Sequence, residues 1–176
     1  AYPLMHRCGI EVEPDRHIAA SNLLRRSAGA NGYVWYKDQP AGPNDWADMG
    51  RTGASAIAHQ LSPYQRNQHS QFAFLQAKVI SQHPQSFPDT HGSPIMGMGY
   101  TAIGANVDPN YFRQLMKANR WWFTLAQCPD GSFYYQPNRD NAGYCSASRI
   151  AATAVTAFII SIPKGNLHLT RKKNIE

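Results

Sequence analysis

Arg120-Trp-Trp-Phe-Thr-Leu-Ala-Gln-Cys-Pro-Asp-Gly-Ser-Phe-Tyr-Tyr135 is the stretch that decides how this chain folds. It predicts a helix that carries two tryptophans and Leu125 and then stops at a turn. Pro129 can set the first central dihedral of a turn and Gly131 can take a positive φ, so Pro-Asp-Gly is typical of such a stop. A second aromatic cluster follows the turn directly. We interpret the stretch as the joint between the two helices of one pair.

The composition is that of one folded domain. The chain has 176 residues, of which 43% are hydrophobic and 16% are charged, which is enough to bury a core. Its formal net charge is +6 and its pI is about 9.4, but the basic residues are scattered apart from the tail segment 171–173. This charge suits an anionic ligand. No nucleic-acid recognition motif is present, so we expect no nucleic-acid partner.

The remaining compositional features concern membranes, cysteines and the ends of the chain. The longest apolar run, 151–162, is about half the length of a membrane span, which predicts a buried core helix and no membrane span. Cys8, Cys128 and Cys145 are expected to be free buried thiols, with a Cys128–Cys145 disulfide as the alternative in an oxidising compartment. Because the chain starts at Ala1 without a signal peptide, we expect a piece of a longer protein.

Three cap signals predict the starts of three helices. Asp15 precedes an apolar pattern that runs to about residue 28, with Ile18, Leu23 and Leu24 on its inner side. Ser62 is followed by Pro63 and Gln65, which predicts a capping box with proline at the first helical position. Asp108 and Pro109 repeat the cap and the proline before a helix that continues into the opening stretch.

Three further helices are predicted at 51–61, 95–105 and 146–162, whereas residues 1–14 lack periodicity and are expected to lead in without a helix. The cap residues Asp15, Ser62 and Asp108 are 47 and 46 residues apart. The glycines that open the second helices, at positions 50, 97 and 143, have the same spacing of 47 and 46 residues. A fixed period of this length is typical of repeat architectures.

The sequence therefore predicts an all-α domain over 15–163 with three tandem helical hairpins, 15–61, 62–105 and 108–162, and a basic tail at 164–176. The first helix of each hairpin carries charged residues, as expected for a helix with one face in solvent. The second helix is rich in Ala, Gly, Ser and Thr, as expected where helices crowd together. We expect the first helices to be outer and the second helices to be inner.

The joint after the aromatic helix resembles a known motif. Gln127 followed by Gly131-Ser132-Phe133 resembles the glutamine-aromatic motif of squalene-cyclase and prenyltransferase type α/α toroids, although Phe133 stands where that family usually has Trp. The segments 50–59, 86–93 and 127–141 resemble a bacterial domain of unknown function in the same superfamily. The resemblance implies a partial toroid with outer and inner helices.

The resemblance implies no particular reaction. The Asp-x-Asp-Asp motif of the cyclases and the Asp-x-Cys element of the zinc prenyltransferases are both absent from the sequence. Complete toroids of this type have more helix pairs than the three visible here. The resemblance therefore implies that the rest of a larger chain, or a second subunit, completes the ring.

The three long joints, 29–50, 83–94 and 128–145, are expected on one rim above the inner-helix N-termini, whose positive dipole ends favour anions. Functional residues often lie on loops held by a rigid scaffold. Three hypotheses compete for this rim. In the first, the domain is a non-catalytic scaffold or a module that binds a ligand or peptide, and the rim is structural.

In the second hypothesis the rim binds an acidic polysaccharide or cleaves it as a lyase, since aromatic rings stack on sugars and cations neutralise carboxylates. Helical-toroid polysaccharide lyases use the same residue types, which is an analogy of fold and composition. The candidate catalytic residues are Asp89, His91, Tyr134 and Arg139, and the candidate binding residues are Arg51, Trp35, Tyr135, Asn138 and Asn141.

In the third hypothesis the protein is a zinc-dependent enzyme. His91 with Cys128, Cys145 or Asp89 offers ligand types that suit zinc, although their spacing matches no recognised signature. His59, near the end of a predicted inner helix, is expected to be a hydrogen-bonded structural residue rather than a ligand.

Overall fold

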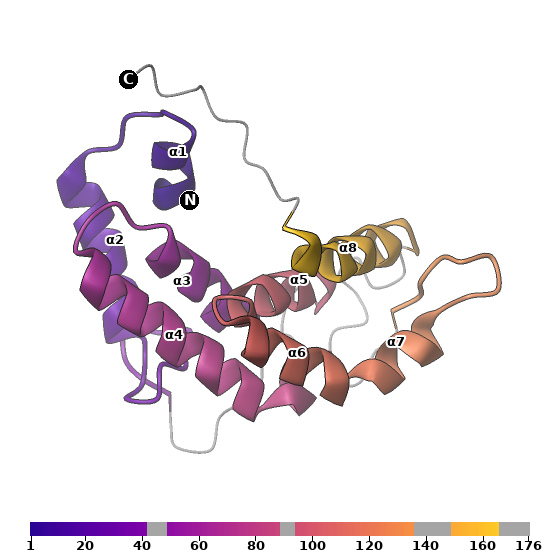
Figure 1. Cartoon of the computed structure of the whole chain (residues 1–176). Helices are drawn as coiled ribbons and strands as arrows, with labels where there is room; N and C mark the ends of the chain where they lie inside the picture. The colour runs from indigo at the N-terminus through magenta and orange to yellow at the C-terminus, as the bar shows by residue number, and fades with distance from the viewer. Residues whose placement is uncertain (42–48, 89–93, 136–148, 166–176) are drawn as a thin grey trace.

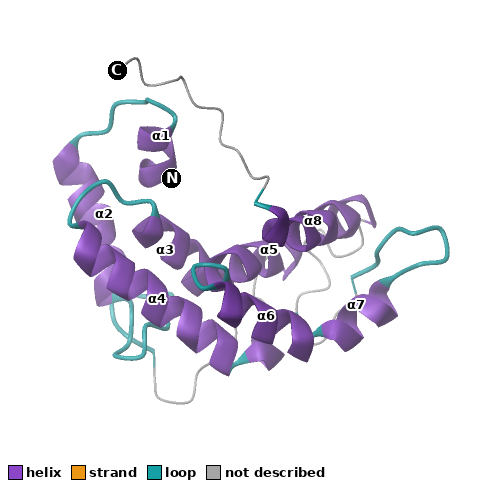
Figure 2. Cartoon of the chain, viewed as in Figure 1, coloured by secondary structure: helices purple, strands orange, loops and turns teal. Residues whose placement is uncertain are grey.

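The computed structural model describes residues 1–41, 49–88, 94–135 and 149–165, and these residues form helices without a β-strand (Figures 1 and 2). The prediction of an all-α protein is confirmed for them. The α-helices are α1 (Tyr2–Arg7), α2 (Pro14–Arg26), α3 (Gly50–Gln60), α4 (Arg66–Gln82), α5 (Pro94–Ala105), α6 (Pro109–Ala118), α7 (Arg120–Ala126) and α8 (Arg149–Ser161). Short 3-10 turns, η1 (Pro84–Ser86) and η2 (Ile162–Lys164), follow α4 and α8.

The helices form two rows that curve together (Figure 1). One row contains α3, α5 and α8, in which α5 contacts both of the others. The other row contains α4 and α6, which contact each other and both pack on α5. The core lies between the rows, where large side chains from α4, α5, α6 and α7 are buried together. It includes Ile80, Met98, Leu115 and Trp122.

Helices α3 and α5 cross with their backbones in contact. A Cβ atom built on Gly53 would lie 2.1 Å from the carbonyl oxygen of Tyr100, and one built on Gly104 would lie 2.4 Å from the Cα of Gly53. Only glycine fits at such a contact. The α5–α8 contact is looser, because a Cβ on Gly99 would lie 3.4 Å from Cγ1 of Val155.

The N-terminal segment departs from the sequence-based expectation, because residues 2–7 form helix α1. Pro3 lies in its first turn, where proline has the right φ and lacks only an N–H that would be unpaired. Pro3 is also buried. A six-residue helix is too short to show periodicity, which explains why the pattern missed it.

One of the three predicted caps is confirmed. The Asp108 carboxylate accepts a 2.8 Å hydrogen bond from the Asn110 N–H at the start of α6. The other two are wrong: α2 begins at Pro14, so Asp15 lies in its first turn, and α4 begins only at Arg66. Ser62 bonds within its own turn and to His17, so it does not cap the helix.

Replacing Asp108 with Ala is expected to lower the free energy of unfolding by about 1 kcal/mol, because the substitution leaves the first turn of α6 without its side-chain acceptor. Urea unfolding followed by circular dichroism measures the change. Asp15→Ala is the matched control, since Asp15 makes no cap hydrogen bond, and it is expected to have a smaller effect. Equal losses for the two variants would contradict the assignment of the cap.

Two expectations about helix faces and lengths are also wrong. On α2 the buried residue is His17, whereas Ile18 and Leu23 are 38% and 45% exposed. The predicted long helix after Asp108 is divided into α6 and α7 at Asn119. The Asn119 side chain donates to the carbonyl oxygens of Leu115 and Pro84, at 3.0 Å and 2.8 Å, and so stabilises this break.

The cysteines are less buried than predicted. Cys8 is exposed and Cys128 is half-buried, and both are free thiols, while Cys145 lies outside the described residues. Separately, no helix in the described part of the chain is long and apolar enough to cross a membrane, in agreement with the expectation from the sequence.

Candidate functional site

An apolar groove of about 830 Å³ lies beside the α3–α5 crossing. We call it the α3–α5 groove. Helices α3 and α5 contribute most of its lining, α8 adds a further wall, and the N-terminal residues on α1 close one side. The lining residues are Ala1, Pro3, Leu4, Ala54, Ile57, Ala58, Gln60, Leu61, Met96, Gly99, Tyr100, Ile103, Asn106, Val107, Val155 and Phe158.

The helical spacing of α5 places three of its large side chains in the groove. Met96, Tyr100 and Ile103 are four and three residues apart, so they share one face of the helix. Met96 is 52% exposed and Tyr100 is 44% exposed, although both belong to α5, which packs between α3 and α8. Gly99, which lies between them in the sequence, lines the groove without a side chain that would fill it. An exposed apolar stripe of this kind is typical of a surface that binds a partner or a ligand.

The lining determines what the groove can bind. Apolar side chains dominate it, and the polar side chains are confined to Gln60, Asn106 and the Tyr100 hydroxyl. Its volume falls within the range of about 300–1,000 Å³ that is usual for ligand sites. The groove therefore suits apolar groups held by shape, with a few hydrogen bonds at the edge.

The loop before α3 (27–35) and the loop before α8 (126–134) share one backbone hydrogen-bond pattern. In the first, the N–H of Gly29 donates to Tyr33 O at 3.0 Å, and the N–H of Trp35 donates to Ser27 O at 2.9 Å. Val34 forms an isolated bridge with Ala28. The Val34 N–H also donates to Oγ1 of Thr52 in the first turn of α3, at 3.1 Å.

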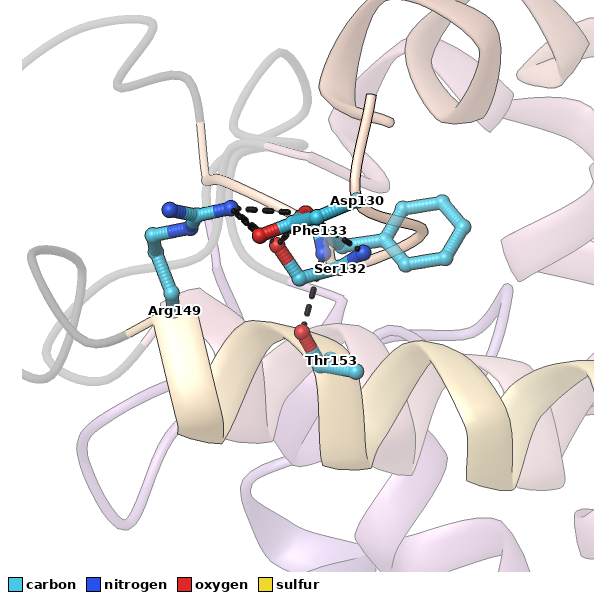
Figure 3. Close-up of polar contacts among 5 residues, drawn as sticks. All are labelled: Asp130, Ser132, Phe133, Arg149 and Thr153. Atoms are coloured by element: carbon cyan, nitrogen blue, oxygen red, sulfur yellow. Dashed lines mark hydrogen bonds and ion pairs between the residues drawn. The ribbon is translucent and has the colours of Figure 1, made fainter. Parts of the chain in front are cut away.

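The second loop repeats each of these bonds with loop residues 99 positions later and a threonine acceptor 101 positions later. The N–H of Cys128 donates to Ser132 O, and the N–H of Tyr134 donates to Ala126 O, both at 2.8 Å. The Phe133 N–H donates to Oγ1 of Thr153 on α8 at 2.9 Å (Figure 3). Gly32 and Gly131, the matching glycines, have φ of +90° and +83°. Each loop is therefore attached to the following helix in the same way.

An ion pair strengthens the second loop. Arg149, the first residue of α8, pairs with the Asp130 carboxylate at 2.7 Å and also contacts the Ser132 hydroxyl (Figure 3). The hydrogen bonds that Ser132 donates, together with the charge of Arg149, lower the pKa of Asp130. Asp130, which the sequence placed on a candidate rim, is thus engaged in holding the loop.

Thr52→Val is expected to lower the free energy of unfolding by about 1–3 kcal/mol, because it leaves the buried Val34 N–H without an acceptor. Thermal unfolding of the purified variant measures this loss. Thr124→Val serves as the control, since the Thr124 hydroxyl is exposed and bonds only to the preceding turn of α7. A Thr52→Val protein as stable as the control variant would contradict a structural role for this bond.

The candidate rim residues fall into two groups. Asp89, His91, Asn138, Arg139, Asn141 and Cys145 lie outside the described residues. Among the others, Tyr134 is half exposed, whereas Tyr135 is buried and its hydroxyl donates to the carbonyl oxygen of Pro88 at 2.7 Å. Within the described ranges no group of three or more His, Cys, Asp or Glu side chains could hold a metal ion.

Arg51 and Trp35 lie together beside the N-terminus of α3. The Arg51 guanidinium carbon is 3.4 Å from the ring centroid of Tyr36 and 5.9 Å from that of Trp35, which is a cation–π arrangement. These residues form the part of the predicted rim that the structure brings together. They are separate from the lining of the α3–α5 groove.

His59, expected to be a structural residue, is buried and hydrogen-bonded. Its Nδ1 lies 2.6 Å from Nδ1 of His69 on α4. Burial, followed by the nearby charges of His69, Arg25 and His17, lowers the pKa of His59 to about 4. The sequence did not indicate this pairing, since the two residues come from different helices.

The candidate residues predicted from the sequence lie on polar loops, and the groove was not predicted. The signal that was available is the spacing of Met96, Tyr100 and Ile103, which places them on one face of the helix, apart from the core residues Ile95 and Met98.

Comparison with known proteins gives a family match. A family model described as "Domain of unknown function (DUF6288)" matches residues 3–170. No curated protein and no solved structure matches the chain.

Proposed function

We propose that this chain, which belongs to the family described as domain of unknown function DUF6288, is a non-catalytic module that binds the apolar side chains of a peptide. The observation that carries the proposal is the α3–α5 groove, with Met96 and Tyr100 exposed in its wall. Shape and apolar lining favour a peptide whose large side chains recur on one helical face, as in other helix-in-groove complexes.

We further propose the finer architecture that the sequence suggested, a partial α/α toroid of squalene-cyclase type with three tandem helical hairpins. The shared hydrogen-bond pattern of loops 27–35 and 126–134 supports a repeat, as does the placing of α3, α5 and α8 in one row. In this arrangement the groove lies on the inner face of the arc. The rest of a larger chain, or a second subunit, completes the ring.

The groove is tested with the apolar reporter dye anilinonaphthalene sulfonate and with two peptides of the same Leu and Lys composition. One peptide places its leucines on a single helical face and the other scatters them. The first is expected to displace the dye. Tyr100→Glu and Met96→Glu are each expected to weaken its binding about tenfold or more, because they place a carboxylate among apolar walls.

Phe74→Glu is the matched control, since Phe74 is similarly exposed but lies on α4, outside the groove. It should leave binding unchanged. Equal displacement by the two peptides, or equal binding by the groove and control variants, would overturn the proposal. Circular dichroism of each variant separates lost binding from lost structure.

A second candidate function is the binding or lyase-type cleavage of an acidic polysaccharide on the rim. The observation in its favour is the grouping of Arg51 with Tyr36 and Trp35 beside the α3 N-terminus. Uronate polymers provide the test, because a lyase leaves unsaturated ends that absorb ultraviolet light. No new absorbance and no binding to the polymers would remove this candidate, while a zinc assay on protein purified without chelator tests the zinc-enzyme alternative.

A further inference from the structure

Helices α4 and α6 lie side by side and run in the same direction (Figure 1). In the first turn of α6, the Tyr111 ring packs on Phe74 in the middle of α4, with ring centroids 5.4 Å apart. Beyond the last turn of α6, the Asn119 side chain donates to the carbonyl oxygen of Pro84, which follows α4. The two helices therefore stay together over about two turns and leave a seam between them.

The aromatic pair lies at the surface of this seam. Phe74 is 46% exposed and Tyr111 is half-buried. Two rings in this position form a small apolar surface on which another apolar side chain can pack. Aromatic rings are enriched at the centres of protein interfaces for this reason.

Three exposed cations accompany the aromatic pair. Lys78 lies four residues after Phe74 and so one turn further along the same face of α4. Arg113 and Lys117 are also four residues apart and share an exposed face of α6. None of the three cations forms an ion pair within the part of the chain that the structure describes, and Arg113 contacts the neutral side chain of Asn110. We call this surface the α4–α6 face, and it consists of Phe74, Lys78, Tyr111, Arg113 and Lys117.

The helices around this face carry no carboxylate. The sequences of α4, α6 and α7 contain neither Asp nor Glu, and Asp108, the residue before α6, is engaged as the cap of that helix. Exposed arginines elsewhere have partners, since Arg16 pairs with Glu13 and Arg26 pairs with Asp38. The α4–α6 face is therefore a basic surface that attracts an acidic partner.

We propose that the α4–α6 face binds an acidic amphipathic helix of a partner protein. The apolar side chains of that helix pack on Phe74 and Tyr111, while its carboxylates meet Lys78 on α4 and the cations on α6. The seam between two helices matches the shape of a third helix laid along it. The proposal goes beyond the peptide-binding function, because the α4–α6 face shares no residue with the lining of the groove.

The chemistry of the face favours a protein helix over other polyanions. Affinity for a nucleic acid rises with the number of phosphates that cations neutralise, and three cations provide few such contacts. Binding to an anionic bilayer requires apolar side chains that enter the lipid, whereas Phe74 lies against Tyr111. A helix with acidic and apolar side chains uses both the rings and the cations.

The test uses a fluorescent peptide of Leu and Glu that places its leucines on one helical face, and its anisotropy is followed as protein is added. The peptide is expected to bind, and to bind more weakly as salt is raised. The double variant Lys78→Glu, Lys117→Glu is expected to weaken binding about tenfold or more, because two attractions become repulsions. Phe74→Ala is expected to weaken binding about fivefold, since the apolar contact is lost.

The double variant Arg7→Glu, Lys164→Glu is the matched control, because it makes the same change of net charge at exposed cations on α1 and η2. This control and Tyr100→Glu, which lies in the groove, should both leave binding of the acidic peptide unchanged. Equal weakening by the matched control would attribute binding to net charge alone. Loss of binding in Tyr100→Glu alone would place the peptide in the groove, and either result overturns the proposal. Far-ultraviolet circular dichroism checks that each variant is folded.

Three further ligands decide the kind of partner. A peptide of the same composition with scattered leucines, vesicles that contain phosphatidylserine, and a single-stranded oligonucleotide are each titrated in the same way. Each is expected to bind more weakly than the amphipathic peptide. If any of them binds as tightly, and loses that binding in the Lys78→Glu, Lys117→Glu protein, the assignment to an acidic helix is wrong.

The α4–α6 face and the groove are tested independently. If the acidic peptide binds the α4–α6 face while neither Leu and Lys peptide displaces the dye from the groove, the proposed function fails and this inference remains. If the groove binds its peptide as expected but the acidic peptide does not bind, the inference fails and the function remains.

Discussion

Gly53→Ala is expected to destabilise the fold by about 3 kcal/mol or more. The new Cβ would lie 2.1 Å from the Tyr100 carbonyl oxygen, and backbone cannot move aside as a flexible side chain can. The gain in helix propensity from Gly to Ala, about 1 kcal/mol, is too small to offset the clash. Urea unfolding measures the difference.

Gly99→Ala is the control for this prediction, since it makes the same change on the α5 helix. Its Cβ would meet Val155 at 3.4 Å, an ordinary contact, so the variant is expected to be as stable as the parent or slightly more so. Gly104→Ala should behave like Gly53→Ala, because its Cβ would lie 2.4 Å from the Gly53 Cα. A Gly53→Ala protein as stable as Gly99→Ala would show that α3 and α5 are further apart than described.

The second large effect is a loss of stability in mild acid. The pKa of His59 is about 4 in the folded protein and 6.5 when the residue is exposed, so below pH 6.5 the unfolded state binds more protons. The stabilisation is complete above pH 6.5 and is lost as pH falls to about 4. The pKa difference corresponds to about 3 kcal/mol.

Urea unfolding at a series of pH values measures this dependence. The carboxylates of Asp38 and Asp130 have pKa values below their ordinary 3.8, so their contribution is lost at lower pH and does not overlap with this window. His59→Gln is expected to be less stable at neutral pH but to show a flatter profile down to pH 4. A parent protein whose stability is constant over this range would contradict the burial of a neutral His59.

The sequence predicted helices α3 and α5 well. The predicted segments 51–61 and 95–105 differ by one residue from the starts of α3 and α5, because runs of small residues between clear turn signals leave few alternatives. It could not predict the break at Asn119, which depends on the Pro84 carbonyl oxygen, 35 residues away, accepting a hydrogen bond from the Asn119 side chain. The helix propensity of neighbouring residues cannot indicate a hydrogen-bond partner so far away in the sequence.

In the candidate site, too, local groupings were predicted from the sequence and contacts between distant segments were not. The grouping of Arg51 with Trp35 was predicted from their place at one joint, and the structure brings them together. The groove was not predicted, because it is made by the relative placing of four helices and has no polar motif. The His59–His69 contact also arises only when α3 turns back into α4, so a pattern along one helix does not contain it.

The loops at 27–35 and 126–134 have a consequence for engineering this chain. Their shared bonds run between backbone atoms, and the side chains they require are a glycine with positive φ and a threonine on the following helix. The two segments therefore share one backbone hydrogen-bond pattern. A chimera that carries the second loop in place of the first should keep its register on α3, because Thr52 offers the acceptor that Thr153 offers on α8.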